Sequence, residues 1–382
     1  MNTKLAYSLC ICIYAKIYVN LFWRLRILNK LVLIDGNSLS FRAFYALPLL
    51  SNHAGIHTNA VYGFAMLLEK IIKEEKPNHF LVAFDAGKTT FRHSKYSEYK
   101  GGRQKPPPEL SEQFPYIRQL LDAYHIKRYE LDNYEADDII GTLSRQADEE
   151  DFETIIITGD RDLTQLATDN VTIYYTKKGV TDVDHYTPKF IAEKYNGLVP
   201  KQIIDMKGLM GDTSDNIPGV AGVGEKTAIK LLNQFESVEG VYEHIEEVTA
   251  KKLKEKLINS KDDALMSKDL ATINVHSPIE VSLEDTKLTL QDDTTEKIEL
   301  FKKLEFKQLL ADIDTSSTNE EVIDKTFEIE QDFQNVDLND LNEAVIHFEL
   351  EGTNYLKDTI LKFGFYTNHQ HVVINAEDVK DY

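Results

Sequence analysis

The sequence predicts an α/β fold in which a mostly parallel sheet is followed by a smaller helical lobe. Three short apolar runs, at residues 31–35, 79–85 and 154–160, each end in an aspartate, as buried strands of a parallel sheet often do where they reach a loop. Helical patterns lie between the runs, and strands that alternate with helices favour a parallel sheet. From about Pro200 to Leu310 only helical patterns recur.

The first strand and the helix after it are the clearest local signals. LVLID at 31–35 is a continuous apolar run that ends in a carboxylate and is followed by Gly36, Asn37 and Ser38. From Asn59 onward, apolar residues recur at helical spacing with charges only on the other face, which predicts an amphipathic helix.

The second and third strands flank a helix that begins with acids. We expect this helix at Tyr134–Glu150, because acidic residues fill its first turn and apolar residues on one face follow them. The three strands end at Asp35, Asp85 and Asp160. Since the carboxyl ends of parallel strands meet at one edge of a sheet, where ligands bind, these three side chains should lie close together.

The rest of the chain divides by composition. The chain of 382 residues, 42% hydrophobic, is long enough for two or three domains with cores of their own. An acidic, polar segment poor in large apolar residues follows the helical part and is typical of a linker. Ala344–Leu350 and Ile360–Tyr366 then resemble strands of another domain, cut short at Tyr382. The predicted parts are 1–27, 28–199 for the sheet core, 200–311 for the helical lobe, 312–340 for the linker and 341–382.

Composition also bears on the compartment and on possible ligands. The net charge of −20 argues against nucleic acid as a partner, but the charge is uneven along the chain and must be considered segment by segment. Both cysteines, Cys10 and Cys12, lie in the first 27 residues, so no disulfide or cysteine metal site is possible in the rest of the sequence. Residues 1–27 are apolar, poor as a signal peptide and marginal as a membrane span, and we interpret them as a non-native extension. We expect a cytoplasmic protein.

Carboxylates are concentrated at the predicted strand ends and at the turns that follow. Besides the strand-end aspartates, acids occur in the motifs Glu-Ala-Asp-Asp, Asp-Arg-Asp and Asp-Thr-Ser-Asp. The nine candidate site residues are Asp35, Asp85, Glu135, Asp137, Asp138, Asp160, Asp162, Asp212 and Asp215.

Each of these acids has an ordinary structural explanation when it is taken alone. The helix dipole favours acids in a first turn, which applies to Glu135, Asp137 and Asp138. An aspartate after a strand often caps a turn, and Asp212 and Asp215 could cap the helix that they precede. These explanations do not account for nine carboxylates near one edge, which would repel one another and raise their own pKa values unless cations offset the charge.

Divalent cations are the simplest source of that charge. Oxygen ligands, without cysteine or a suitably spaced pair of histidines, favour Mg²⁺ or Mn²⁺ over Zn²⁺. Two such ions, about 3.5–4 Å apart, commonly serve phosphodiester hydrolysis, one activating water and the other stabilising the leaving oxygen. The acids therefore predict a nuclease that uses two metal ions.

A cationic segment, residues 88–105, separates the second strand from the acidic helix. Its bases are opposed only by Glu98, and Phe91, Tyr96 and Tyr99 lie among them. A solvated helix face is the ordinary explanation of a charge run. The interleaved aromatic residues favour instead a site for single-stranded nucleic acid, whose phosphates attract bases and whose nucleobases stack on rings. The basic residues are Lys88, Arg92, Lys95, Lys100, Arg103 and Lys105.

A glycine turn at Gly222 and Gly224 precedes an apolar helix in the predicted lobe. Glycines allow a close approach of the backbone, so that their amides and the next helix N-terminus can bind a phosphate without reading sequence. Lys226 and Lys230 add charge, and Thr227 lies between them. A tight turn between packed helices is the alternative, but the flanking pattern favours a helix-hairpin-helix motif.

From about Leu28 to Ala311 the sequence resembles the flap endonuclease family, in the form of the 5′-3′ exonuclease domain of bacterial DNA polymerase I. The motifs LVLIDGNS, AFDAG, TFR, YEADDIIGTL, TGDRDLTQL, LMGDTSDNIPGVAGVGEKTA and LATI stand in the family's order and approximate spacing. The resemblance implies a PIN-like core with a helical arch, and a helix-hairpin-helix lobe that binds duplex DNA and often a K⁺ ion.

The resemblance also implies roles for single residues. For the first metal it implies Asp35, Asp85, Glu135 and Asp137 as ligands, and for the second Asp160, Asp162 and Asp212. Asp138 and Asp215 resemble supporting residues of the catalytic site. The residues implied to orient the scissile phosphate and the displaced 5′ strand are Lys88, Arg92, Tyr99, Lys100 and Arg103. The residues implied to bind the duplex are Gly222, Gly224, Lys226, Thr227 and Lys230.

The end of the chain resembles the start of a proofreading-exonuclease-like domain, including VIHFELEGTNY at 345–355. Glu349 and Glu351 stand where an active proofreading domain carries Asp-x-Glu, which puts that activity in doubt. Polymerase activity would require residues beyond Tyr382.

We expect a structure-selective 5′-3′ exonuclease and 5′-flap endonuclease that acts on DNA with 5′ flaps, nicks or gaps, as a monomer and without a membrane. Two other functions are open. An RNA-cleaving PIN-type nuclease would share the core, but the helix-hairpin-helix lobe speaks against it. A non-catalytic DNA-junction scaffold would not need acids at all nine positions.

Overall fold

The computed structural model describes residues 29–103, 105–177, 182–289 and 295–318, together with strands at 329–330, 345–350, 360–366 and 371–375. Contacts between residues divide the chain into two compact units, Met1–Ala311 and Asp312–Tyr382. The predicted extension at 1–27 lies outside the described residues.

A six-stranded sheet, in the order β3-β2-β1-β4-β5-β6, is the centre of the first unit. All neighbouring strands are parallel except β5 and β6, which are antiparallel. The predicted strands correspond to β1, β2 and β4, and the structure adds the other three. The strands are β1 (Lys30–Asp35), β2 (His79–Thr90), β3 (Lys127–Asn133), β4 (Glu153–Thr158), β5 (Val171–Thr176) and β6 (Val183–Tyr186).

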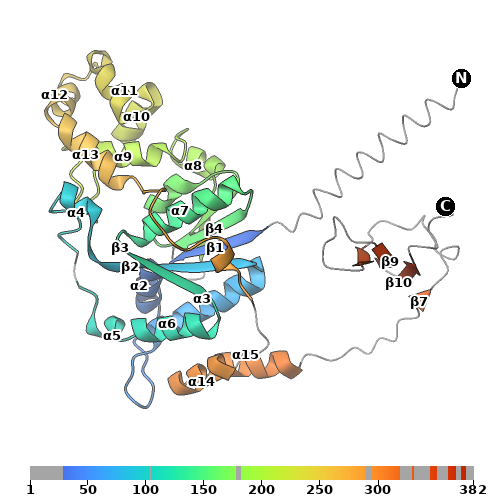
Figure 1. Cartoon of the computed structure of the whole chain (residues 1–382). Coiled ribbons are helices and arrows are strands. Elements are labelled where there is room, and N and C mark those ends of the chain that lie inside the picture. Colours follow the sequence, from blue (N-terminus) through green and yellow to red (C-terminus); the bar gives the residue numbers. More distant parts are fainter. Residues whose placement is uncertain are drawn as a thin grey trace, which may run out of the picture. The chain divides into compact units, whose positions relative to one another are not determined.

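Helices cover both faces of this sheet, as the alternation of strands and helices predicts (Figure 1). One face packs against α7 (Ala136–Glu149), the predicted acidic helix. The other carries α2 (Gly36–Ala46) and α3 (Asn59–Glu75), and α3 begins at the residue where the helix was expected. Leu31, Val32, Leu33 and Ile34 of β1 are completely buried between the two layers.

The cationic segment after β2 contains little helix. It includes α4 (Phe91–Lys95), and α5 (Pro108–Ser111) follows it before α6 (Phe114–Ala123). Between α4 and α5 the described residues form turns and irregular loop, so helix in the region where the family resemblance implied an arch is limited to these short elements. Pro106, Pro107 and the two glycines at 101–102 explain this, because they disfavour helix.

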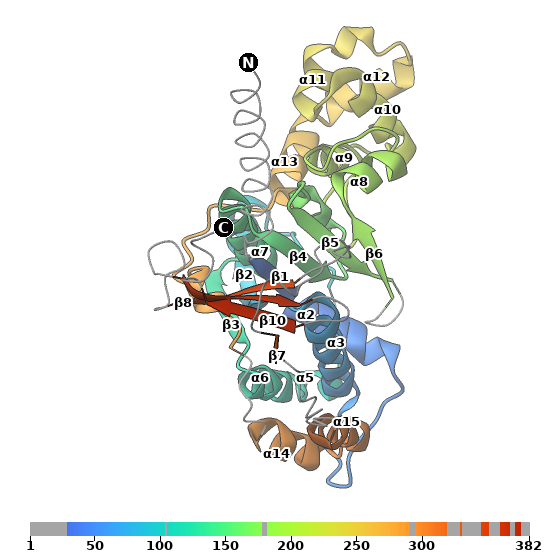
Figure 2. The same cartoon turned by 90° about the vertical axis from the view of Figure 1, so that its right-hand side faces the viewer.

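A helical lobe follows the sheet, and between Thr187 and Thr289 the structure contains no strand. Figures 1 and 2 show α10, α11 and α12 at one end of the first unit, with α6 and α14 at the opposite end. The helices of this region are α8 (Pro188–Lys194), α9 (Gln202–Met210), α10 (Glu225–Phe235), α11 (Val238–Glu243), α12 (Lys251–Asn259) and α13 (Lys261–Ala271), with 3₁₀ turns η2 (Ile245–Glu247) and η3 (Glu284–Thr286). The 3₁₀ turn η1 (Asp162–Leu166) lies earlier, between β4 and β5.

Two helices and a second sheet complete the description. The helix α14 (Thr295–Leu304) packs on α6. It is followed by α15 (Lys307–Thr318), so the first residues of the predicted linker are helical. The second unit contains a sheet in the order β7-β10-β9-β8, in which β8 and β9 coincide closely with the two predicted strands. Its strands are β7 (Ile329–Glu330), β8 (Val345–Leu350), β9 (Ile360–Tyr366) and β10 (His371–Asn375).

A search of the described helices for a membrane-spanning segment found none that is both long and apolar enough.

Candidate active site

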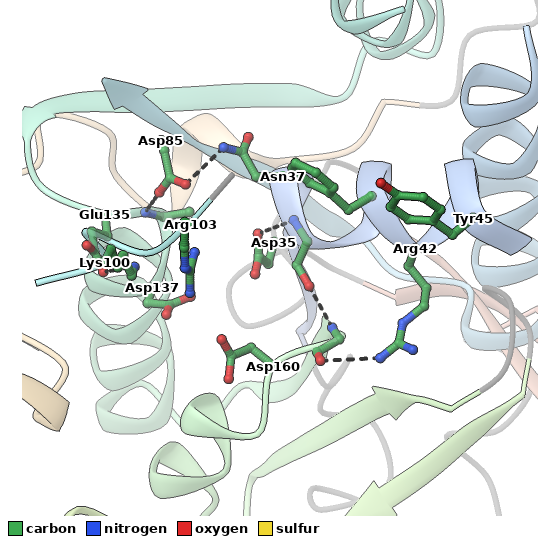
Figure 3. A pocket seen from close by; sticks show the side chains of 14 residues that line it. Asp35, Asn37, Arg42, Tyr45, Asp85, Lys100, Arg103, Glu135, Asp137 and Asp160 are labelled. Atoms are coloured by element: carbon green, nitrogen blue, oxygen red, sulfur yellow. Dashed lines mark hydrogen bonds and ion pairs between the residues drawn. The ribbon is translucent and has the colours of Figure 1, made fainter. Parts of the chain in front are cut away.

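Carboxylates from several strand ends line one cavity of about 520 Å³. Asp35 ends β1, and Asp85 lies at the point in β2 where regular pairing with β3 stops. Asp160 follows β4 by two residues, and Glu135 and Asp137 stand at the start of α7. Figure 3 shows Asp35, Asp137 and Asp160 turned toward the same space. The structure thus brings together the three strand-end aspartates. We call these three residues, together with Glu135 and Asp137, the acidic edge.

Local hydrogen bonds orient the two carboxylates that come from β1 and β2. Asp35 is the N-cap of α2 and accepts hydrogen bonds from the Ser38 amide at 2.9 Å and the Thr158 hydroxyl at 3.3 Å. Asp85 accepts from the Ala136 amide at 2.8 Å and from Asn37 Nδ2 at 2.9 Å. Both carboxylates are therefore held by helix starts, whose amides need acceptors.

Asp137 is held differently from its neighbours. Within the described part of the chain, its carboxylate has no hydrogen bond or ion pair, although it lines the acidic edge. Burial raises the pKa of Asp137 well above its usual range, and the charges of Asp35 and Asp160 raise it further. The charge of Lys100 offsets only part of this effect, so a cation bound in the cavity would favour the ionised form of Asp137.

A second cavity, of about 560 Å³, adjoins the first and shares Asp160 with it. Asp162 and Asp212 line this cavity, and the ammonium group of Lys207 contacts both. Burial, together with the charge of Asp160, raises the pKa of Asp162 to about 7. Burial also opposes the charge of Asp212, but Lys207 and Ser214 outweigh it, so that the pKa of Asp212 is lowered. The seven acids implied as metal ligands thus occupy two neighbouring cavities.

The acidic edge has the chemistry of a divalent-cation site. Burial and the charges of Asp85 and Asp160 raise the pKa of Asp35 to about 7, so the carboxylates repel one another. All donors are oxygens, which suits Mg²⁺ or Mn²⁺. In the described residues, no three His, Cys, Asp or Glu side chains are already arranged as a closed metal site. The side chains fit such ions by number and chemistry, and would have to close around them.

Two residues of the cationic segment reach the acidic edge. The Lys100 ammonium lies 2.8 Å from Glu135 Oε2 and 3.9 Å from Asp215 Oδ2, and the Arg103 guanidinium pairs with Asp215. Both bases line the first cavity. Asp215 therefore acts as an anchor for the cationic segment, which agrees with a supporting role. Lys88 lies in β2, and its side chain is outside the described part of the structure.

Arg92 lines neither cavity, whereas the family resemblance implied that it orients the substrate. Its side chain is 2% exposed and forms two hydrogen bonds of 2.8 Å with Asp138. It also donates to the carbonyls of Leu270 at 3.0 Å and Thr272 at 2.9 Å. Four of its five donors are used inside the protein, so Arg92 connects the cationic segment, α7 and the end of α13.

Tyr99 is also buried, and cannot stack on a nucleobase in this conformation. It is 3% exposed, and its hydroxyl donates to Glu135 at 3.2 Å. Its ring packs with Ile217, Leu270 and Ala271. The aromatic interleaving that suggested stacking is, at this position, a small hydrophobic core.

The first cavity also contains residues that the sequence did not suggest. They come from α2, which begins directly at Asp35, and they include Phe41, Arg42 and Tyr45. Tyr45 is 69% exposed. The spacing of Phe41 and Tyr45 was a signal that could have identified them, because residues four apart lie on the same face of a helix.

The glycine turn has the geometry of a tight hairpin between α9 and α10. Gly211, Gly219 and Gly222 have φ values of 72°, 58° and 77°, which favour glycine. A Cβ on Gly219 would lie 2.1 Å from the Gly211 amide nitrogen, so two backbone segments touch there. Gly224 is the N-cap of α10, and Lys226 and Lys230 on that helix are exposed.

Comparison with known sequences relates the chain to one group of enzymes. The family model for the 5′-3′ exonuclease N-terminal resolvase-like domain matches residues 30–196, and that for the 5′-3′ exonuclease C-terminal SAM fold matches residues 198–294. DNA polymerase I of Bacillus subtilis is 56% identical over 363 residues, which are 93% of this chain and 41% of the relative. DNA polymerase I of Bacillus caldotenax is 60% identical over 294 residues, 77% of this chain and 33% of the relative. The chain thus spans about two fifths or less of these relatives.

Solved structures share the fold at low identity. The T5 5′-exonuclease with bound divalent metal ions (zinc) has a TM-score of 0.54 and 22% identity, covering 72% of this chain and 98% of that one. The bacteriophage T5 flap endonuclease in a pseudo-enzyme-product complex with DNA and metal ions has a TM-score of 0.53 and 23% identity, covering 64% of this chain and 89% of that one. The two family models together match more than two thirds of the sequence, and the chain belongs to the 5′-3′ exonuclease family.

Proposed function

We propose that the chain is a structure-selective 5′-3′ exonuclease and 5′-flap endonuclease that hydrolyses DNA phosphodiesters with two divalent ions. The observation that carries the proposal is the acidic edge, where carboxylates from three strand ends and one helix start line a single cavity. Buried like charges of this kind are costly and occur where a cation is bound. The family membership and the DNA and metal ions recorded for a T5 relative support the same function.

The two cavities divide the proposed ligands as follows. Asp35, Asp85, Glu135 and Asp137 would hold one Mg²⁺ or Mn²⁺, and Asp160, Asp162 and Asp212 the other. Bound ions of this kind supply an activated water and charge stabilisation for the leaving oxygen. Lys207 would have to release Asp162 and Asp212, and its ammonium would then be available to a phosphate.

The bases of the cationic segment would orient the substrate. Lys100 and Arg103 are positioned by Glu135 and Asp215 at the cavity, where they can contact the scissile phosphate. Lys88 is proposed to act with them. Arg92, Tyr99 and Asp138 are positioning residues in this proposal, because they hold the start of α7 and the cationic segment without facing the cavity.

The hairpin would hold the duplex. Exposed amides at Gly222 and Gly224, with Lys226, Thr227 and Lys230 on the next helix, can grip phosphates independently of sequence. We further propose that the substrate is DNA with a 5′ flap, nick or gap, that the protein acts as a monomer, and that a K⁺ ion binds at the hairpin. Polymerase and proofreading activities are outside this proposal, and Glu349 and Glu351 are outside the described side chains.

Mapping of cleavage sites on labelled flaps tests the proposal. We expect cleavage of a DNA flap near its junction with the duplex, leaving 5′-phosphates, with Mg²⁺ or Mn²⁺ and not with EDTA. An all-RNA flap of the same shape is the control, and its preferential cleavage would identify an RNA nuclease. Junction binding without any metal-dependent cleavage or calorimetric metal binding would identify a scaffold.

A further inference from the structure

The second cavity is lined by a basic side chain that forms no ion pair with the proposed metal ligands. Arg161 lies between Asp160 and Asp162 in the sequence, and it lines this cavity. Its guanidinium carbon is 5.2 Å from the centre of the Tyr175 ring. Burial opposes its charge, but Tyr175 and neighbouring tyrosines outweigh burial and raise the pKa of Arg161.

The other bases at the site already have partners in the protein, and Arg42 donates to the carbonyls of Lys177 and Gly159. Lys100 contacts Glu135, and Lys207 contacts Asp162. Within the described residues, no carboxylate lies at ion-pair distance from Arg161, although aspartates precede and follow it. Arg161 is exposed and forms one side-chain hydrogen bond, with Tyr175, so its other donors are available for an anion.

Tyr175 places this arginine beside the first cavity. The ring is on β5, and Arg42 also lies over it, with its guanidinium carbon 5.9 Å from the ring centre. Arg42 lines the first cavity, Arg161 the second, and Asp160 both. A strand whose scissile phosphate lies at the acidic edge would therefore have a neighbouring phosphate close to Arg161.

The walls of the second cavity suit a nucleotide. Its volume of about 560 Å³ is within the range of small-ligand sites. Ile203, Met206 and Tyr195 form an apolar floor that is at most 5% exposed, and the half-buried Met210 also lines the cavity. A sugar and base can pack there without sequence-specific hydrogen bonds, while a planar guanidinium binds a phosphate with two donors.

We infer that the second cavity is a nucleotide subsite, in which Arg161, held by Tyr175, binds the phosphodiester next to the scissile one. This inference rests on the proposed nuclease function. It assigns to Arg161 the positioning of the strand, and to Tyr175 the positioning of Arg161.

Single neutral phosphates test the contact directly. A set of DNA flaps, each with one methylphosphonate in place of a phosphate near the cleavage site, is cleaved by the wild type under single-turnover conditions with subsaturating enzyme. We expect Arg161→Gln to slow cleavage of the unmodified flap about tenfold, the usual effect of one charged hydrogen-bonded contact. At one position next to the cleavage site, a methylphosphonate should slow cleavage by the wild type by a similar factor. The same methylphosphonate should not slow Arg161→Gln any further.

Matched variants separate this contact from a structural effect. Arg128→Gln removes an arginine paired with Asp122 on the sheet edge and should behave as the wild type. Tyr175→Phe keeps the ring but removes the hydroxyl that is hydrogen-bonded to Arg161, so it should lose less activity than Tyr175→Leu, which should resemble Arg161→Gln. The log–log salt dependence of duplex binding, measured with Ca²⁺, should become shallower by about 0.9 in Arg161→Gln, corresponding to one lost phosphate contact.

The outcomes are distinct. If Arg161→Gln matches Arg128→Gln, or slows every methylphosphonate substrate by the same additional factor, the subsite is wrong while the nuclease proposal stands. If the wild type does not cleave the unmodified flap, the proposed function fails first and the subsite fails with it.

Discussion

Asp137 is the carboxylate of the acidic edge with the least support from its own protein. Asp35 and Asp85 each accept hydrogen bonds from helix starts, whereas Asp137 receives none from the described residues. Its position at the first turn of α7 directs it to the cavity, and its raised pKa follows from burial and its acidic neighbours. We propose that Asp137 would hold a divalent ion in the first cavity.

We therefore expect Asp137→Asn to abolish Mg²⁺-dependent flap cleavage and leave DNA binding largely intact. Even residues that only support a metal ligand commonly change activity 10–100-fold, so the loss should exceed about 100-fold. Asp132→Asn, the same change at an exposed position of β3, is the control. Single-turnover cleavage and binding are measured together, and full activity of Asp137→Asn would refute the assignment.

Arg92 leads to a prediction about stability rather than about substrate contact. Its removal would leave Asp138, which is completely buried, without its ionic partner. Breaking such a pair costs about 3–5 kcal/mol. We expect Arg92→Ala to lower the free energy of unfolding by about that amount, as measured in urea.

Arg92→Lys should recover part of this stability, because it keeps the charge but not the two-donor geometry. If Arg92→Ala is stable but cleaves slowly, the result would support instead the substrate-orienting role that the family resemblance implied.

At the scale of the elements, the hairpin between α9 and α10 depends on one close backbone contact. A methyl group on Gly219 would meet the Gly211 backbone and would also stand at positive φ. Gly219→Ala should therefore destabilise the lobe by at least about 1 kcal/mol and weaken duplex binding.

Gly224 provides the matched control for this prediction. A Cβ there meets nothing within 4 Å, and its φ of −107° suits any residue. Gly224→Ala keeps the backbone amide, so it should keep the fold and lose less affinity than Gly219→Ala in the same thermal and binding assays. Equal behaviour of the two variants would show that the hairpin is not the element that grips DNA.

The start of β2 contributes a pH-dependent contact. His79 is 3% exposed, and its Nδ1 lies 3.0 Å from both the Leu283 carbonyl and the Thr286 hydroxyl. Burial lowers the pKa of His79 below the usual 6.5. Below pH 6.5 the unfolded chain binds a proton that the folded protein does not, so this contact loses stability as the pH falls.

We expect the stability difference between wild type and His79→Gln to change between pH 7.5 and 5.5, in the direction that favours the variant at low pH. The change should be at most about 1.4 kcal/mol for each pH unit. Urea unfolding of both proteins at several pH values measures it, and a constant difference would contradict a neutral buried His79.

The elements that the sequence predicted are those with one dominant local signal. β1 and β4 are buried on both faces and read as continuous apolar runs, so their pattern is plain. β3 is at the sheet edge, mostly exposed, and its sequence KRYELDN has no apolar run. Its place in the sheet comes from pairing with β2, which is a long-range contact and leaves little local trace.

At the scale of the whole molecule, divalent ions should stabilise the fold. Anything that binds the folded chain alone raises its stability by mass action, and relief of the buried like charges adds to this at the acidic edge. We expect MgCl₂ to raise the melting temperature above that in NaCl of equal ionic strength, and EDTA to reverse the effect. Asp137→Asn should reduce the gain, and an identical gain in both proteins would mean that the ions bind elsewhere.

The candidate site was more predictable from the sequence than the contacts around it. The acids could be placed together because parallel strand ends share an edge, a rule that needs no tertiary detail. The burial of Arg92 and Tyr99 could not be predicted, because it depends on Leu270 and Thr272, which return to the core from a distant part of the chain. Composition alone cannot tell a base that faces a phosphate from one that faces a carboxylate.

The carboxylates of the two cavities are spread along the sequence from Asp35, at the end of β1, to Asp212, which follows all six strands of the sheet. A nascent chain therefore lacks the complete set of these carboxylates until Asp212 has been synthesised, after β6 and α9. A chain truncated before Asp212 would lack one of the proposed metal ligands in the same way.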